Sequence, residues 1–99
     1  MNEADLSITI EGDSILVKVR GEIDLQTAPQ LASCLSSIRG DASVDCSGLD
    51  FIDSTGLRVF MQAQKAFDER GDRLAVRNVP THIRRIFDIA GVSAFLDIE

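Results

Sequence analysis

Two kinds of hydrophobic spacing alternate along this chain, and their order restricts its fold more than any other feature. Apolar residues recur at every second position in 6–10 and again in 15–20, which is typical of half-buried strands, and the residues at 11–14 have turn chemistry. Beyond this predicted hairpin, helical spacing alternates with short apolar runs. The pattern predicts strands over 42–47 and 74–76, and helices from Thr27 to a stop at Gly40, from Thr55 to Arg70, and from Thr81 to a stop at Gly91.

The ends of these elements follow from capping and turn residues. Thr27 and Gln30 have the spacing of a capping box, which predicts that the Thr27 hydroxyl caps the first helix. Residues 21–24 and 48–53 are expected to be irregular connections. After the last helix, the apolar residues within 95–98 predict either an edge strand or a short docking tail.

The alternation of strands and helices calls for a partly parallel sheet with right-handed crossovers, here with an antiparallel hairpin at its start. We expect a single α/β domain over residues 1–99, because 99 residues suffice for one core but not for two. At this length the helices can cover one face of the sheet well and the other only thinly.

Composition and charge narrow the classes of partner. The formal net charge of −6 disfavours nucleic acid and anionic membranes, because both would be repelled over most of the surface, whereas a basic patch on another protein would be attracted. No apolar run approaches the length of a membrane span, and Met1–Asp5 lacks the basic and apolar segments of a secretory signal. We therefore expect a cytoplasmic protein.

The thiols and the imidazole offer little metal chemistry. Cys34 and Cys46 are the only cysteines and His82 is the only histidine, which is too few for a structural zinc site. We interpret the thiols as reduced and partly buried, behaving as small apolar groups, and His82 as a surface or capping residue.

The junction Asp50–Leu57, where an apolar strand gives way to a helix, carries two adjacent hydroxyls behind a carboxylate. Helix capping by one of them would contribute about 1 kcal/mol. However, Asp53, Ser54 and Thr55 are three successive residues able to cap, which is more than one cap needs, and Gly56 leaves the backbone open to close approach. One of the two hydroxyls is therefore expected to have a role besides capping, but the spacing alone does not show which role.

Catalysis and nucleotide binding do not fit this junction. A serine nucleophile needs a base in reach, and the segment is neither a Gly-x-Ser-x-Gly elbow nor a phosphate-binding loop with its lysine. Three loop carboxylates could converge on magnesium, but the acidic pair and lysine of a phosphoacceptor-aspartate receiver are missing, so solvated acids and caps are the preferred interpretation. These carboxylates belong to Asp24, Asp50 and Asp53.

The second helix divides into a polar and an apolar side. A narrow solvent-facing stripe consists of Arg58, Gln62, Lys65 and Glu69, and the opposite side, expected to face the sheet, consists of Val59, Phe60, Ala63 and Phe67. Leu57 and Met61 border the polar stripe. They fit either the periphery of the core or an apolar rim for a partner beside Ser54.

Three blocks of sequence together resemble the anti-sigma factor antagonists of the STAS domain family, over essentially the whole chain. The resemblance implies a STAS-type mixed sheet of four or five strands with three or four helices packed mainly on one face. It also implies a bacterial partner-switching protein without catalysis or cofactor. The blocks are Gly21-Glu22-Ile23-Asp24 with Thr27-Ala28, then Phe51-Ile52-Asp53-Ser54-Thr55-Gly56-Leu57, and Ile86-Phe87-Asp88-Ile89-Ala90-Gly91.

In this family the unmodified antagonist binds a serine kinase that doubles as an anti-sigma factor, and so releases the sigma factor. The kinase phosphorylates the serine of an Asp-Ser-x-Gly-Leu motif, and a PP2C-type phosphatase restores the active form. The resemblance therefore implies phosphorylation of Ser54 and a protein that is monomeric when free. The partner contacts expected around Ser54 are Asp24, Asp53, Thr55, Gly56, Leu57, Arg58 and Met61.

Two alternatives remain at this point. Thr55 offers a second hydroxyl for modification, and Arg58 lies close enough along the helix to pair with a phosphate on Ser54. At the level of function, isolated STAS domains also serve as structural subunits of lipid-transport ATPases. The intact Asp-Ser-Thr-Gly-Leu and Gly-Glu-Ile-Asp blocks favour the regulator over this role.

Overall fold

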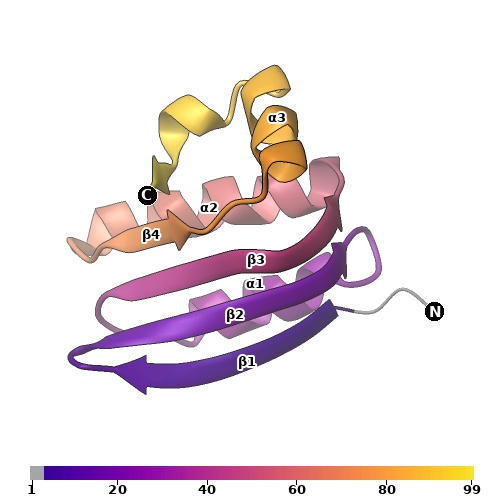
Figure 1. Cartoon of the computed structure of the whole chain (residues 1–99). Coiled ribbons are helices and arrows are strands. Elements are labelled where there is room, and N and C mark those ends of the chain that lie inside the picture. The colour runs from indigo at the N-terminus through magenta and orange to yellow at the C-terminus, as the bar shows by residue number, and fades with distance from the viewer. Residues whose placement is uncertain (1–3) are drawn as a thin grey trace.

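A mixed sheet of five strands forms one layer of the molecule, as described by a computed structural model over residues 4–99. The strands lie side by side in chain order (Figure 1). The first two pair antiparallel and every later neighbour pairs parallel, which confirms the predicted hairpin followed by parallel strands. They are β1 (Ala4–Glu11), β2 (Ser14–Ile23), β3 (Ala42–Ile52), β4 (Leu74–Arg77) and β5 (Asp97–Ile98).

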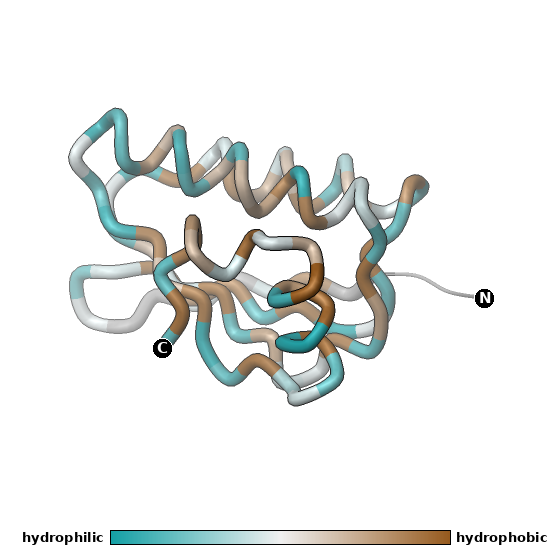
Figure 2. The backbone as a smooth tube through the Cα atoms, turned by 90° about the horizontal axis from the view of Figure 1, so that it is seen from above, coloured by the Kyte–Doolittle hydropathy of each residue, from teal (hydrophilic) through white to brown (hydrophobic). Residues whose placement is uncertain are grey.

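Helices α1 (Ala28–Ser36) and α2 (Ser54–Arg70) cover one face of this sheet (Figure 1). Helix α3 (Thr81–Ile89) packs against α2, where the rings of Phe60 and Phe87 meet edge-on with centroids 5.8 Å apart. Seen from above, the sheet and the helices α1 and α2 form two layers, with α3 and the C-terminal segment across one edge (Figure 2). The expectation of helices mainly on one face is confirmed.

The side of α2 that its periodicity directs to the sheet lies in the core. Phe60 and Phe67 are completely or almost completely buried, Val59 is buried and Ala63 is half-buried. Each large apolar side chain buried in this way contributes roughly 1.5–3 kcal/mol. The alternating colours along α2 in Figure 2 reflect this amphipathic pattern. As predicted, the polar stripe is exposed: Arg58, Gln62, Lys65 and Glu69.

Strands β2 and β3 are longer than the sequence indicates. Residues 21–23 and 48–52, expected to be irregular, continue the parallel pairing up to Ile23 opposite Ile52. Two shifts in register, one on either side of the pair Arg20–Gly48, absorb the irregularity. A Cβ at Gly48 would lie 2.7 Å from Cγ of Arg20, so this close approach of the strands explains the glycine.

The predicted capping box of α1 is wrong. Thr27 makes no side-chain cap bond to the helix, because its hydroxyl donates to the carbonyl of Glu22 at 2.8 Å and accepts from the Asp24 N–H at 2.9 Å. The helix also ends at Ser36, before the expected stop at Gly40. By contrast, α2 ends at Arg70 as predicted, and Gly71 caps it in the left-handed conformation with φ of 79°.

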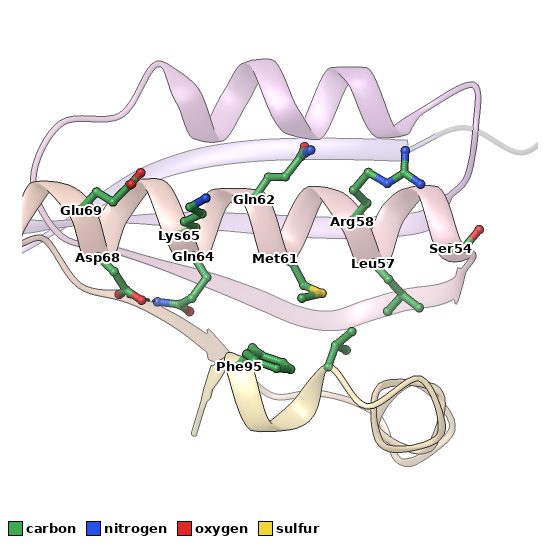
Figure 3. A pocket seen from close by; sticks show the side chains of 11 residues that line it. Ser54, Leu57, Arg58, Met61, Gln62, Gln64, Lys65, Asp68, Glu69 and Phe95 are labelled. Carbon is green, nitrogen blue, oxygen red and sulfur yellow. Dashed lines mark hydrogen bonds between the residues drawn. The ribbon is translucent and has the colours of Figure 1, made fainter.

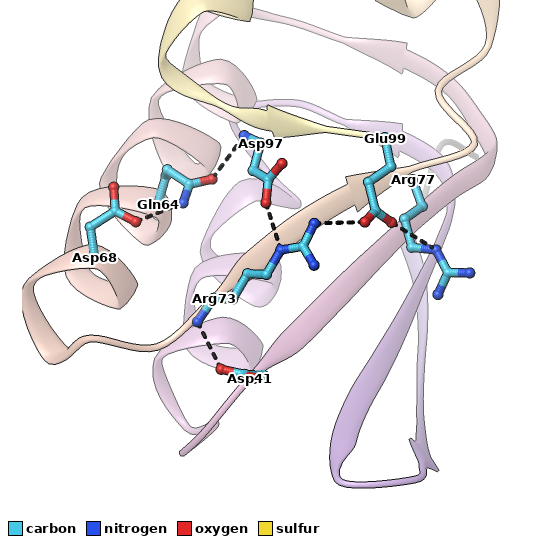
Figure 4. A network of polar contacts seen from close by, with 7 residues as sticks. All are labelled: Asp41, Gln64, Asp68, Arg73, Arg77, Asp97 and Glu99. Carbon is cyan, nitrogen blue, oxygen red and sulfur yellow. Dashed lines mark hydrogen bonds and ion pairs between the residues drawn. The ribbon is translucent and has the colours of Figure 1, made fainter.

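Of the two alternatives for the C-terminal segment, the structure shows an edge strand, but one shorter than the apolar residues within 95–98 suggest. Residues 93–95 form the 3₁₀ helix η1 (Ser93–Phe95), and only Asp97–Ile98 pair with β4. Polar contacts fix this short strand (Figure 4): Arg73 reaches Asp97 at 2.8 Å and Glu99 at 2.7 Å, and the Asp97 N–H donates to Gln64 at 3.3 Å. The tail is therefore joined to both β4 and α2.

Both cysteines are free thiols, in agreement with the sequence interpretation. Cys34 is half-buried and Cys46 is fully buried in the core. Burial raises the pKa of both thiols, and for Cys46 burial together with the neighbouring charge of Asp45 raises the pKa to about 12. Cys46 therefore behaves as a small apolar group.

Two sequence predictions fall outside the described residues. The side chains of Ile8 and Ile10, expected on the apolar face of β1, are not described, although their backbone pairs with β2. The interpretation of Met1–Asp5 as lacking a secretory signal depends on the undescribed residues 1–3.

Candidate functional site

The junction between β3 and α2 lies where the paired strands β2 and β3 end. The Asp53 N–H donates to the carbonyl of Ile23 at 3.1 Å, so the start of α2 is tied to the end of the neighbouring strand. The Asp53 carboxylate accepts hydrogen bonds from the N–H groups of Thr55 at 2.9 Å and Gly56 at 3.1 Å. Asp53 is therefore the N-cap of α2, in an extended backbone conformation typical of that role.

This capping by Asp53 leaves the hydroxyls that follow it without a structural task. Ser54 is the first residue of α2, is exposed, and forms no side-chain hydrogen bond with another residue in 4–99. Thr55 is half-buried. Of the two hydroxyls, that of Ser54 is the more accessible to a second protein.

Among the side chains that the structure describes, none forms a hydrogen bond with Ser54 that would let it act as a general base. The imidazole Nε2 of His82 lies 2.8 Å from the carbonyl oxygen of Asp50, and so connects the first turn of α3 to the end of β3. His82 is exposed, as expected for a surface residue. A serine without a general base lacks the activated nucleophile that covalent catalysis needs.

Gly56 is needed by the protein's own core. It is buried, and a Cβ there would lie 2.6 Å from Cγ1 of Ile52 and 2.7 Å from Cγ2 of Ile23. The close approach that we inferred at this position from the sequence is thus made by the ends of β2 and β3. Gly56 allows the first turn of α2 to sit directly on the strand ends, which holds Ser54 at the surface.

Asp24 lies in the neighbouring loop, directly after Ile23. Its carboxylate accepts hydrogen bonds from the N–H groups of Gln26 at 3.0 Å and Thr27 at 3.1 Å, and so orders the turn into α1. Because Ile23 pairs with Ile52, the loops that begin at Asp24 and Asp53 leave the sheet side by side. The structure brings these two predicted site residues to the same edge.

Within residues 4–99, no three side chains of His, Cys, Asp or Glu lie close enough together to hold a metal ion. The magnesium cluster considered for Asp24, Asp50 and Asp53 therefore finds no support in the geometry. In the same part of the chain, no helix has the length and apolar character needed to cross a membrane.

A groove of about 900 Å³ begins at Ser54 and follows α2 (Figure 3). The predicted contacts Leu57, Arg58 and Met61 all line it. Leu57 is buried and Met61 is half-buried, so Leu57 belongs to the periphery of the core while Met61 is an accessible apolar surface. Arg58 lies at the rim and points away from the groove floor (Figure 3).

Sequence reasoning missed the opposite wall of this groove. This wall consists of Val92, directly before η1, and Phe95, the last residue of η1. Gln64 lines the groove from the α2 side. Phe95 belongs to the segment expected to form either an edge strand or a short docking tail, and it lies in η1 with 64% of its surface exposed and faces Met61 across the groove (Figure 3). In the sequence, the aromatic Phe95 within the apolar segment 95–98 was the feature that could have indicated this wall.

Comparison with known proteins gives consistent matches. A family model described as "Mlab, STAS domain" matches residues 6–97. The anti-sigma-B factor antagonist of Staphylococcus epidermidis is 34% identical over 87 residues, which cover 84% of this chain and 81% of that protein.

Solved structures share the fold. An anti-sigma factor antagonist from Mycobacterium paratuberculosis superposes with a TM-score of 0.82 at 20% identity, covering 96% of this chain and 84% of that one. Unphosphorylated SpoIIAA gives a TM-score of 0.79 at 15% identity, covering 96% and 88%. Phosphorylated Bacillus SpoIIAA gives 0.74 at 15% identity, covering 96% and 91%.

The five-stranded mixed sheet with its helices on one face is thus the fold of a STAS domain. The chain belongs to the anti-sigma factor antagonist family of STAS domains.

Proposed function

We propose that this protein is an anti-sigma factor antagonist that is switched by phosphorylation of Ser54. Unmodified, it binds a serine kinase that also acts as an anti-sigma factor, and so frees the sigma factor. The observation that carries the proposal is an exposed Ser54 hydroxyl with no hydrogen-bond partner in residues 4–99, directly after the capping Asp53.

In the proposed reaction the kinase supplies all the catalysis. The Ser54 oxygen attacks the γ-phosphorus of ATP, the bond to the β-phosphate oxygen breaks, and ADP leaves while the hydroxyl proton is lost. This chain contributes only the accessible hydroxyl. A PP2C-type phosphatase would hydrolyse the phosphate ester and restore the binding form.

The position of Ser54 explains how one phosphate could end binding without unfolding the domain. A phosphate brings a charge of about −1.5 to −2, and the positive end of the helix dipole at the start of α2 offsets part of that charge. SpoIIAA has this fold in its unphosphorylated and phosphorylated forms alike. At an interface that accepts a neutral hydroxyl beside Asp53, however, the same charge would cost several kcal/mol by repulsion and desolvation.

The expected partner contacts divide by position. Asp53 directly precedes Ser54, and Asp24 follows Ile23, the partner of Ile52, at the same end of the sheet. Leu57, Arg58 and Met61 continue the surface along α2. We propose that Thr55 and Gly56 act mainly by holding the junction in place, since they are half-buried and buried respectively.

The test is phosphorylation by purified serine kinases of the anti-sigma class from the same genome, with ATP and with the site located by mass spectrometry. We expect phosphate on Ser54, its loss in Ser54→Ala, and its retention in the matched control Thr55→Val. Modification of Thr55 instead would overturn the choice of residue. No modification by any such kinase, together with stable co-purification with a transporter ATPase, would favour the structural-subunit role.

A further inference from the structure

The groove along α2 has an apolar lining that the domain itself leaves uncovered. Leu57 and Met61 on the α2 side and Val92 and Phe95 on the η1 side supply this apolar lining, and Phe95 is 64% exposed. Figure 3 shows the Met61 and Phe95 side chains facing each other across the groove. An exposed phenylalanine beside a methionine, which adapts its shape easily, is typical of a surface that packs against another molecule.

The shape of the groove selects the kind of segment that fits. Its α2 side runs from Ser54 to Glu69, a length of about 22 Å at 1.5 Å per residue. Along this length the wall is a helix whose backbone groups are already hydrogen-bonded to each other, so a strand could not dock by extending a sheet. Contacts must therefore come from side chains, and a helix of about four turns matches the length.

The charges along the groove are ordered. Arg58 and Lys65 are seven residues apart on the same stripe of α2, both are exposed, and neither forms an ion pair with another residue in the described part of the chain. Asp68 and Glu69 lie at the far end, away from Ser54. Acidic side chains are thus favoured opposite Arg58 and Lys65, and a positive group is favoured opposite Glu69.

We infer that this groove is the docking site for an amphipathic helix of a protein partner, with acidic residues along the edge that faces Arg58 and Lys65. The helix lies antiparallel to α2. Its N-terminus, the positive end of its dipole, meets Asp68 and Glu69, and its C-terminus meets the start of α2 at Ser54.

This inference rests on the proposed function in one respect, which is the regulation of the groove by Ser54. Ser54 lines the groove at the end where the C-terminus of the docked helix lies. A phosphate there meets the negative end of the partner's dipole, so the modification that we propose also weakens docking in the groove.

The experiment uses the full chain and a designed peptide. The probe is a helical peptide of about 16 residues with leucines along one face and glutamates seven residues apart along the adjoining edge. Its twin has lysines in place of the glutamates. Binding is followed by NMR of the Met61 methyl group and the Phe95 ring.

We expect the glutamate peptide to shift both signals and to bind roughly tenfold or more tightly than the lysine twin. This order is informative because the net charge of −6 attracts the lysine twin if only long-range charge matters. Binding of the lysine twin that is equal or tighter would overturn the inference. So would the absence of shifts at these two residues at millimolar peptide.

Variants locate the site and control for folding. Phe95→Ala should weaken binding of the glutamate peptide severalfold at unchanged melting temperature, because the side chain is largely exposed. Ile89→Ala is the matched control, since Ile89 is 81% exposed but does not line the groove, and it should bind normally. Equal weakening in both variants would contradict docking in the groove.

The same assay separates this inference from the proposed function. Lys65→Glu should reverse the peptide preference, whether or not any kinase modifies Ser54. Conversely, phosphorylation of Ser54 by a kinase in the absence of peptide binding would leave the proposed function standing and remove the groove as a docking site.

Discussion

At the scale of single residues, the start of α2 assigns different tasks to neighbouring side chains. The Asp53 carboxylate accepts hydrogen bonds from the N–H groups of Thr55 and Gly56, which have no partner within the helix. Ser54 projects from the same turn without a hydrogen-bond partner in residues 4–99. A modification of Ser54 would therefore remove no hydrogen bond on which the fold depends.

Substitution of the two residues should show this difference. We expect Asp53→Ala to lower the free energy of unfolding by about 1 kcal/mol, because the cap is lost. Ser54→Ala should change it by less than about 0.5 kcal/mol. Urea unfolding followed by circular dichroism measures both. A larger loss in Ser54→Ala than in Asp53→Ala would mean that the hydroxyl, rather than the carboxylate, supports the helix.

Cys46 provides a second prediction at this scale, which concerns alkaline pH. Its pKa of about 12 lies above that of a thiol in the unfolded chain, so the folded state binds the proton more tightly. The stabilisation is complete below the unfolded pKa, near 8.5, and is lost as the pH rises toward the folded value. Stability should therefore fall by up to about 1.4 kcal/mol per pH unit above pH 9.

The measurement is urea unfolding at several pH values between neutral and alkaline, in wild type and Cys46→Ala. The alanine variant should be less stable at neutral pH by about 1 kcal/mol, because a small cavity forms, but should show a shallower alkaline decline. Parallel declines in both proteins would refute the role assigned to this thiol.

The sequence indicates Ser54 and its neighbours as a candidate site, but it could not divide their roles. Asp53, Ser54 and Thr55 are all able to cap, and the choice among them depends on which residue adopts the extended backbone conformation. In that conformation the Asp53 N–H donates to the carbonyl of Ile23, 30 residues earlier in the chain, and no local pattern encodes such a contact.

At the scale of elements, the first turn of α2 is seated directly on the ends of β2 and β3. Gly56 makes this possible, since Ile52, Ile23 and the carbonyl oxygen of Ile23 occupy the space that a Cβ would need. The position of the helix start relative to the sheet, and hence the exposure of Ser54, depends on this contact.

Gly56→Ala tests this packing, because helix propensity and the close contacts predict opposite changes in the free energy of unfolding. Helix propensity alone predicts stabilisation by about 1 kcal/mol, because alanine replaces glycine inside a helix. The contacts at 2.6 and 2.7 Å predict destabilisation by about 1–3 kcal/mol instead. We expect the loss, measured by urea unfolding with Gln62→Ala, on the exposed side of α2, as the control. An increase in stability would show that the strand ends do not constrain this turn.

Elements that follow local periodicity could be predicted, and those that depend on distant partners could not. The helix α2 and its two sides follow from spacing within the helix. The extension of β2 and β3 depends on pairing across the register shifts beside Gly48, and the short strand β5 pairs with β4 and contacts Arg73 and Gln64, which lie far from it in the sequence. The α2 side of the groove follows from local periodicity, whereas the η1 side depends on contacts between distant residues. The sequence analysis therefore missed the η1 side.

At the scale of the whole molecule, the proposed switch changes charge while it leaves the fold in place. One phosphate would take the formal net charge from −6 to roughly −8, at the edge where the loops of Asp24 and Asp53 meet and where the groove begins. The phosphate would be tolerated inside the domain by the start of α2, and repelled only where a partner covers Ser54. Affinity should therefore respond far more strongly than stability.

The most direct test compares the affinity of the kinase that modifies Ser54 for the unmodified and the Ser54-phosphorylated protein, by titration calorimetry with an ATP-free kinase preparation. We predict a loss of roughly a hundredfold or more, which corresponds to about 2.7 kcal/mol, with the melting temperature of the phosphorylated protein within about 5 °C of the unmodified one. Equal affinities for the two forms would contradict the account, and so would a loss of affinity that accompanies unfolding of the domain.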